Sequence, residues 1–504
     1  MTERVKKATN IQSMVFMKLQ FTLNTPLNVG SGEDEYSDHD CVRDFDGNPF
    51  IPATSIAGLL RSSMDKKSAN CLMGYTKGRE AEQSRLMISD GVFIDPKNTP
   101  KLSVRDGVAL NENRVAKDQT KYDYEVIQSG ASFETEISFK VFKEDNQVKW
   151  QIFAEPLLYA LKLVNEDKLR LGYKTNRGLG SLKVSGQYKA FEGDDLKNSI
   201  AFRKADNWAG WDGIENIDNL IANATGTARD DIQTITVEAC IPGTICVRTY
   251  NPLSLEIQSD DQQIQADYLQ IQADYQQLTD GNDAVLPGTS LAGAFSKTAG
   301  ILLGELGMDE LNIRRTLAWL FGHVPSKEEA AGKKRERKAK PKEEKPLPDS
   351  WNSAIRFLEA KLKKGKDMPL TRTKIDRFSG SAAKGSLFSE RVYQGAETEL
   401  SIQIRGEGLD WAAGLVVLVL KDIHAGLTVF GGEVAVGRGI MQLGDDDSPL
   451  FTYQDETKYL RALAGFLEKA EAKEEEAFPR HVLAAFPREA SQDVQENTSQ
   501  EVAL

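Results

Sequence analysis

A loop rich in carboxylates is the feature of this sequence best suited to chemistry. After the apolar residues 25–29, the small residues 30–32 free the backbone, and the acids that follow are Glu33, Asp34, Glu35, Asp38 and Asp40. An Asp-Gly-Asn-Pro turn at residues 46–49 and a helix N-cap at Thr54 or Ser55 come next. Because a helix N-terminus attracts anions, an acidic loop beside one predicts a site that handles phosphate groups.

The elements that position this loop occur a second time in the chain. The block IPATSIAG at residues 51–58 is repeated as LPGTSLAG at residues 286–293, each after an Asp-Gly-Asn turn, and NPLSLEI at residues 251–257 resembles TPLNV at residues 25–29. Three further pairs follow in the same order, namely residues 84–90 with 353–359, 125–130 with 390–395, and 172–180 with 431–439. Matched blocks in one order indicate a duplicated domain.

The blocks resemble the RAMP superfamily of CRISPR-associated proteins, and within it the backbone subunits of type III effector complexes, the Csm and Cmr kind. The family pattern is a Gly-rich loop, an acid, a basic-acidic pair, a Pro-initiated helix, an Ile-Asp-Arg and Ala-Lys segment, and a late glycine-rich loop. The matching positions are residues 29–32, Asp38, Arg43 with Asp44, residues 52–55, residues 375–377 with Ala383 and Lys384, and the glycine loops at 172–180 and 431–439.

The resemblance implies that one acid of the first loop, Asp38, cleaves target RNA. RNA cleavage can proceed by attack of the ribose 2′-hydroxyl on the adjacent phosphorus, which requires positioning and removal of a proton. Because an Asp with an ordinary pKa near ~4 is a poor general base at neutral pH, we expect a divalent metal, Mg²⁺ or Mn²⁺, at Asp38. Asp34 and Asp40 remain alternatives for this role.

A second catalytic acid is expected at Asp274. Alignment of the two Asp-Gly-Asn turns sets Asp274 opposite Asp40, and it reaches the place of Asp38 only if the loop is two residues shorter. The Gly-Ser-Gly of the first loop also has no counterpart there. Asp267, or a second unit without catalysis, therefore stays open as an alternative.

Glycines and cations of both units are expected to hold the guide RNA. Glycines allow backbone N–H groups to approach phosphates, and neighbouring arginines and lysines add positive charge. The candidate RNA-binding residues are Arg43, Arg61, Lys117, Gly172, Arg177, Gly178, Gly180, Arg377, Lys384, Gly431, Gly437, Arg438 and Gly439.

The order of apolar segments predicts an α+β protein made of two tandem ferredoxin-like domains, which resemble the RNA-recognition module and carry loop insertions. We expect a first RAMP domain over residues 1–190, an acidic linker over 191–233 and a second RAMP domain over 234–450. A basic insertion at 325–348 and a tail at 451–504, first helical from 456 to 475 and then disordered, complete the chain.

The composition limits the possible locations and partners. No apolar run is long enough to span a membrane, the first ten residues lack a secretory signal, and four scattered cysteines suit neither disulfides nor zinc, so we expect a cytoplasmic protein. The net charge of −12 disfavours nucleic acid at first sight, but residues 191–236 and 451–504 carry most of it. The two repeats are close to neutral and can still present a basic groove.

Together these features predict a backbone subunit that binds CRISPR guide RNA and target RNA beside other type III effector subunits, and that is a metal-dependent endonuclease. A non-catalytic, structural RNA-binding backbone is the main alternative. A stand-alone nuclease that matures the guide precursor is a third, although it would favour a His-centred site, and only His39 lies near the acidic loop.

Overall fold

The computed structural model describes residues 11–32, 37–78, 80–94, 101–108, 120–143, 149–205, 208–226, 232–249, 273–323, 350–406, 408–444, 451–472 and 477–486. Several expected features lie outside these ranges: the repeat at residues 251–257, the basic insertion at 325–348, Asp34, Lys117, Asp267 and the end of the tail.

The first unit has the strand order of a ferredoxin-like fold. Its main strands are β1 (Ile11–Leu23), β4 (Leu86–Ile88), β8 (Ser132–Phe142) and β9 (Leu182–Glu192), and its helices are α2 (Ala53–Ser62), α3 (Lys66–Met73) and α4 (Trp150–Asn165). The strands pair antiparallel in the order β9-β1-β8-β4, so the fourth, first, third and second strands lie side by side. This is the β-α-β-β-α-β arrangement expected from the sequence.

Residues 13–17 of β1 are buried on both faces of the strand, and each face has its own cover. Met17 and Leu19 belong to the core that α2 and α4 cover. Met14 and Phe16, which point the other way, contact Phe191, Phe202, Trp208 and Trp211. The acidic segment after β9 therefore packs on the first sheet through η2 (Gly193–Lys197), α5 (Asn198–Ala205) and η3 (Trp208–Gly210). Further along this segment, β10 (Glu215–Asn216) pairs with β9, and α6 (Asp218–Asn223) contacts α4.

The second unit repeats this order. Its elements are β11 (Ile232–Ile245), α9 (Gly288–Glu305), α10 (Glu310–Phe321), β16 (Ile355–Phe357), β19 (Phe388–Arg405), α12 (Asp410–His424) and β20 (Gln442–Leu443). The sheet order β20-β11-β19-β16 is again fourth, first, third, second. The two matching sheets confirm the expected α+β class with two ferredoxin-like units.

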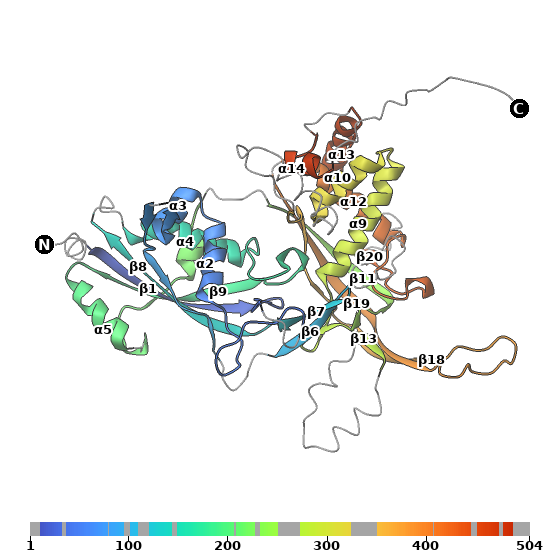
Figure 1. Cartoon of the computed structure of the whole chain (residues 1–504), viewed down its shortest axis with the longest axis horizontal. Helices are drawn as coiled ribbons and strands as arrows, with labels where there is room; N and C mark the ends of the chain where they lie inside the picture. Colours follow the sequence, from blue (N-terminus) through green and yellow to red (C-terminus); the bar gives the residue numbers. More distant parts are fainter. Residues whose placement is uncertain are drawn as a thin grey trace, which may run out of the picture.

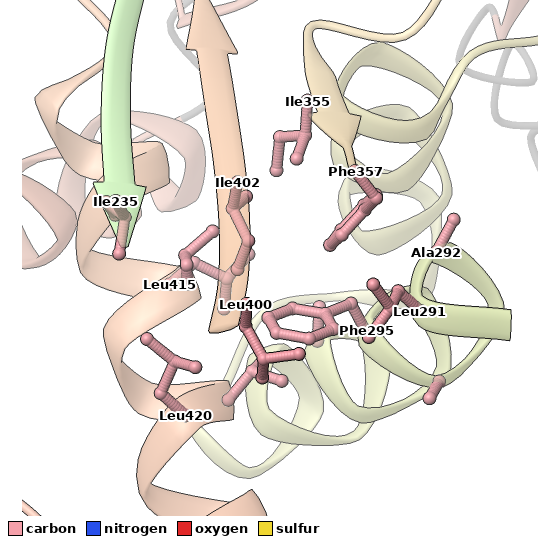
Figure 2. Close-up of a cluster of buried hydrophobic side chains, with 14 of the residues drawn as sticks. Ile235, Leu291, Ala292, Phe295, Ile355, Phe357, Leu400, Ile402, Leu415 and Leu420 are labelled. Carbon is pink, nitrogen blue, oxygen red and sulfur yellow. The ribbon is translucent and has the colours of Figure 1, made fainter. Parts of the chain in front are cut away.

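The second core lies between this sheet and its helices. Figure 2 shows Phe295 of α9 and Leu415 of α12 directed toward Leu400 and Ile402 of β19. The helix expected at residues 456–475 is α13 (Glu456–Glu471), and the short α14 (Arg480–Ala485) follows it. Phe466 of α13 stacks on Trp411 of α12 with ring centroids 3.8 Å apart, so the tail helix belongs to this core.

Each unit also extends a two-stranded hairpin away from its sheet. In the first unit the hairpin is β6 (Leu102–Gly107) with β7 (Tyr122–Ile127), and in the second it is β18 (Lys366–Arg372) with the start of β19. Figure 1 shows the second hairpin as an orange arm that projects from the molecule beside β18. Shorter strands complete the chain: β2 (Tyr75–Lys77), β3 (Glu80–Glu82), β5 (Val92–Phe93), β12 (Arg248–Thr249), β13 (Tyr275–Gln277), β14 (Thr279–Asp280), β15 (Asp283–Leu286) and β17 (Ala360–Lys361).

Arginines that are mostly buried join the two units. Arg105 of β6 forms a two-pronged ion pair with Glu359, and both side chains are almost completely buried. Further arginine contacts cross the junction, among them Arg177 Nη2 to the Phe321 carbonyl at 2.8 Å, Arg405 Nη2 to Asn176 Oδ1 at 2.9 Å, and Arg356 Nη1 to the Lys168 carbonyl at 3.3 Å. A buried charge is costly unless it is paired, so this network holds the units in one arrangement.

Candidate nucleic-acid interface

The first acidic loop presents Asp38 to solvent in a fixed position. The backbone N–H of Asp38 donates to Oδ1 of Asp123 at 2.9 Å, and the backbone N–H of Asp123 donates to Oδ2 of Asp38 at 2.9 Å. Asp123 lies on β7, so the pair attaches the loop to the hairpin. The Asp38 side chain is exposed although its backbone is held, which suits a group that meets a ligand.

Asp40 has a different environment, because it is buried. Its Oδ1 accepts hydrogen bonds from the backbone N–H of Ser37 at 2.7 Å and from the Ser37 hydroxyl at 2.6 Å. Only 5% of the Asp40 surface is exposed. Of the two described candidates for the loop acid, Asp38 is therefore the one that solvent and a ligand can reach.

A buried glutamate, Glu125, supports the loop from behind. Its carboxylate accepts the Cys41 backbone N–H at 3.0 Å and pairs with Arg43 at 2.5 Å. Asn28 joins the same region, since its Nδ2 donates to the Glu125 carbonyl at 2.7 Å and to the His39 carbonyl at 3.2 Å. The guanidinium of Arg43, a candidate RNA contact, thus fixes the loop.

Aromatic rings and one lysine gather beside Asp38. The ring centroid of His39 lies 5.3 Å from that of Tyr173 and 6.2 Å from that of Tyr122. Lys174 Nζ donates to the Tyr122 hydroxyl at 2.7 Å and lies 3.5 Å from the ring centroid of Tyr124. Burial, followed by the charges of Arg105 and Arg177, lowers the pKa of Lys174 to about 7.

The first glycine loop packs closely on its surroundings. Gly172 and Gly180 have positive φ values of 87° and 77°, and a Cβ at either position would overlap a backbone carbonyl, that of Asn28 or that of Leu171. Gly178, at φ 101°, faces the second unit, where a Cβ would lie 2.6 Å from the Glu359 nitrogen. These glycines are required for packing, whatever contact they make with RNA.

The acid of the second unit, Asp274, is held in a related way. Its backbone N–H donates to the Ser389 carbonyl at 2.8 Å, and its Oδ2 accepts the Ser389 N–H at 2.8 Å. Ser389 immediately precedes Glu390, the counterpart of Glu125, and the Asp274 side chain is exposed. Both candidate acids are therefore attached to the strand that carries the buried glutamate.

The second glycine loop packs closely at its two ends, as the first does, but differs from it in between. Gly431 and Gly439 have φ values of 82° and 74°, and a Cβ there would meet the carbonyls of Cys246 and Phe430. Gly437, the counterpart of Gly178, has nothing within 4 Å of such a Cβ. Arg438 is buried and pairs with Glu390 at 2.5 Å and Glu433 at 2.9 Å, so its guanidinium fixes this loop.

The closeness of Gly431 to Cys246 corrects one expected repeat. Gly172 packs on the Asn28 carbonyl, and Tyr173 donates its N–H to that oxygen at 2.8 Å; Gly432 donates in the same way to the Cys246 carbonyl at 2.8 Å. The counterpart of residues 25–29 is therefore the segment around Cys246 at the end of β11, and not residues 251–257. The register of β11 against β19 shifts just before this segment, between Ile241 and Thr244.

Two other candidate contacts lie on the projecting arm. Arg377 and Lys384 are exposed near its tip, where Ile375 pairs with Ala382. Phe378 beside them is fully exposed. An exposed aromatic ring between cations is typical of surfaces that stack on nucleotide bases.

The remaining candidate contact, Arg61, joins two helices. Its guanidinium donates to the Ala69 carbonyl at 3.3 Å, the Gly74 carbonyl at 3.1 Å and Asn70 Oδ1 at 2.9 Å. Arg61 therefore fixes α3 to α2. Its role toward RNA stays a prediction, as does that of Lys117.

Comparison with known protein families identifies the family to which this chain belongs. The model of the RAMP superfamily matches residues 20–183 and 273–442, one match in each ferredoxin-like unit. The chain belongs to the RAMP superfamily, which comprises CRISPR-associated RNA-binding proteins, and it carries two RAMP units in tandem. No curated protein matches the chain. None of the helices in the described part of the chain is both long and apolar enough to cross a membrane.

Several residues of this interface carry no sequence signal that singles them out. Asp123, Tyr122 and Tyr124 come from one strand, and Lys174 joins them from a second segment that lies far away in the chain. The Tyr-x-Tyr pattern at residues 122–124 is typical of a strand, and Lys174 is one of many lysines. Only the fold reveals that they surround the acidic loop.

Proposed function

We propose that this protein is a tandem backbone subunit of a type III CRISPR complex, that it lies along the guide RNA, and that it cleaves the target RNA paired with that guide. RAMP proteins bind CRISPR RNA in multisubunit complexes, and two units in one chain suit a backbone position. The observation that carries the nuclease proposal is the exposed carboxylate of Asp38, which the reciprocal hydrogen bonds with Asp123 hold beside the hairpin.

The reaction would be a transesterification at a nucleotide that the complex holds out of the helix. The ribose 2′-oxygen bonds to phosphorus, its proton leaves, and the bond from phosphorus to the 5′-oxygen breaks. Asp38 would position the reacting nucleotide, and Asp274 would do so in the second unit. Exposure and a held backbone support these assignments for both acids.

A divalent metal fits the site only in part. Among the described residues, no group of three or more His, Cys, Asp or Glu side chains is placed to hold a metal ion. Mg²⁺, however, commonly takes one or two carboxylates and completes its shell with water and substrate phosphate. Asp38 together with an RNA phosphate could hold Mg²⁺ or Mn²⁺, which would stabilise the charge that develops on the phosphate.

The projecting arm supports the RNA-binding part of the proposal. Phe378 offers a stacking face, and Arg377 and Lys384 offer charges for phosphates. This concentration of cations on one arm also answers the objection from the net charge of −12, since binding depends on local surface.

The experiment is a cleavage assay with the complex assembled on its guide RNA. A labelled RNA complementary to the guide should be cut at two sites when Mg²⁺ or Mn²⁺ is present, and a non-complementary RNA of equal length should stay intact. Stable binding of the complementary RNA without cleavage by this chain would instead identify a structural backbone subunit.

A further inference from the structure

Lys174 occupies a special place in the first glycine loop. Its backbone is left-handed, with φ 52°, two residues after Gly172. Such a conformation is uncommon for a residue with a side chain, and residues that adopt it are found preferentially at functional sites. In the second unit Glu433 stands two residues after Gly431 with nearly the same φ, 56°. The two loops thus present opposite charges from one backbone position.

The Lys174 ammonium is surrounded by tyrosines and arginines. It donates to Tyr122 Oη at 2.7 Å, and its Nζ lies 3.5, 4.5 and 5.6 Å from the ring centroids of Tyr124, Tyr122 and Tyr173. The charged groups facing it are Arg105 of β6 and Arg177 of its own loop, and both disfavour a second positive charge. No carboxylate of the described residues pairs with it.

The geometry leaves the Tyr122 proton free for another acceptor. Because Lys174 donates to the phenol oxygen, the hydroxyl hydrogen of Tyr122 can point elsewhere, and the neighbouring ammonium makes it a better donor. Tyr122 is half-buried, so part of its side chain is open to solvent. Burial raises the pKa of the Tyr122 phenol, which keeps it protonated near neutral pH.

Two sets of contacts link Lys174 and Tyr122 to the loop that carries Asp38. Tyr122 precedes Asp123, whose carboxylate accepts the Asp38 N–H, and His39, next to Asp38, has its ring 5.3 Å from that of Tyr173, the neighbour of Lys174. The ring centroid of Tyr122 itself lies 6.2 Å from that of His39, so the Tyr122 side chain neighbours the loop segment that carries the exposed Asp38. We therefore expect the phosphate of a nucleotide positioned by Asp38 to approach the Tyr122 hydroxyl.

We propose that Tyr122 is the proton donor of the first cleavage site and that Lys174 is the positioning residue that makes it one. This inference rests on the nuclease function proposed above. As the bond from phosphorus to the 5′-oxygen breaks, the Tyr122 hydroxyl proton passes to that oxygen, and the Lys174 ammonium returns a proton to the phenolate. The neutral amine then takes a proton from water, so no external oxidant or reductant is needed.

The second unit lacks this pair. With Glu390 matched to Glu125, the positions of Tyr122 and Tyr124 are occupied by Leu387 and Ser389. Glu433, in the place of Lys174, pairs with Arg248 at 2.8 Å, Arg372 at 3.1 Å and Arg438 at 2.9 Å. Cleavage at Asp274 would therefore proceed without this donor, and the two sites should differ in their response to pH.

The test measures the two products separately, under single-turnover conditions, with the guide-loaded complex and a labelled complementary RNA. Asp38→Ala first identifies the product of the first site. Lys174→Met and Tyr122→Phe should each slow that product by roughly 10²-fold, as expected for loss of acid catalysis, and leave the other product unchanged. Retention of guide RNA by each variant serves as the folding control, and Lys458→Met on α13, at an exposed lysine that pairs with Asp410, is the matched lysine control.

The pH profile separates a proton donor from a structural lysine. In the wild type, formation of the first product should decline as the pH rises above about 7, where Lys174 loses its proton. Lys174→Met should remove this decline, and Lys174→Arg should keep the charge but also show no decline. Equal slowing of both products, or an unchanged profile in Lys174→Met, would overturn the inference. If Asp38→Ala removes neither product, the nuclease function itself fails and the inference with it.

Discussion

Asp38 and Asp123 exchange two backbone-to-carboxylate hydrogen bonds of 2.9 Å, across 85 residues of sequence. The exchange makes the position of the exposed acid depend on a strand of the hairpin rather than on its own loop. Because the Asp38 carboxylate accepts one of these bonds, its orientation is fixed before any ligand arrives, which is the kind of preorganisation that positioned catalytic groups require.

Replacement of Asp123 should therefore loosen Asp38 without disturbing guide binding. We expect Asp123→Ala to lower the cleavage rate at the first site by about 10 to 100-fold, since a displaced group loses its alignment. Asp123→Asn keeps an oxygen that can accept the Asp38 N–H, so its cleavage rate at the first site should fall much less. Equal rates for Asp123→Ala and the wild type would show that this pair does not position the acid.

The buried ion pair between Arg105 and Glu359 should be essential for stability. Arg105→Ala leaves the Glu359 carboxylate buried and unpaired, which we expect to cost about 3–5 kcal/mol in the free energy of unfolding. The control is Lys361→Ala, which breaks the exposed pair with Asp283 and should cost less than about 1 kcal/mol. Denaturant titration of both variants gives the comparison, and similar losses would contradict it.

Gly178 and Gly437 provide a matched pair for the junction between the units. Both have a left-handed φ, 101° and 85°, so an alanine strains the backbone at either position. At Gly178 the new methyl group would also meet the Glu359 backbone at 2.6 Å, whereas it meets nothing at Gly437. We expect Gly178→Ala to lower the thermal midpoint clearly more than Gly437→Ala. A larger drop in the thermal midpoint for Gly437→Ala than for Gly178→Ala would mean that Gly178 does not pack closely against the second unit.

The stability of the protein should depend on pH through Lys174. Burial lowers its pKa in the folded state to about 7, while the unfolded chain keeps a value near the usual ~10.5. Between these values the unfolded state binds more protons, so stability should rise with pH. As the pH is raised from 7 to 9, the free energy of unfolding of the wild type should therefore increase relative to that of Lys174→Met. Urea midpoints of both proteins measure this difference. A constant difference would show that Lys174 titrates normally.

Phe378 on the projecting arm should contribute to RNA affinity. Loss of one stacked base costs about 1–3 kcal/mol, so Phe378→Ala should weaken RNA binding by about 5 to 150-fold in a filter-binding or anisotropy assay. Phe45 is the control, because it is equally exposed but lies between Asp44 and Asp46. Phe45→Ala should leave the affinity unchanged, and a comparable loss there would contradict a role specific to the arm.

The fold followed from the sequence because its signals are local and occur twice. The blocks IPATSIAG and LPGTSLAG mark α2 and α9, and the repeated order of strands around them gives the two ferredoxin-like sheets. The family match to both units agrees with this. Sequence similarity failed at residues 251–257, however, since the backbone contacts of the second glycine loop make Cys246 the counterpart of Asn28.

The surroundings of the candidate acids could not be predicted in the same way. Exposure separates Asp38 from Asp40, and exposure depends on the Ser37 turn that buries Asp40. The burial of Arg438 depends on Glu390 and Glu433, which approach it from a strand and from its own loop. Lys174 is distinguished only by tyrosines some fifty residues earlier in the chain. Such contacts between distant segments leave no periodic pattern in a single sequence.

The most direct test of the account is the product pattern of target cleavage by the guide-loaded complex with Mg²⁺ or Mn²⁺, compared among the wild type, Asp38→Ala, Asp274→Ala and the double variant. We predict that each single variant loses one distinct product and that the double variant binds the complementary RNA but leaves it intact. A double variant that yields the full wild-type pattern would contradict the central claim, and the protein would then be a scaffold that holds RNA for cleavage by another subunit.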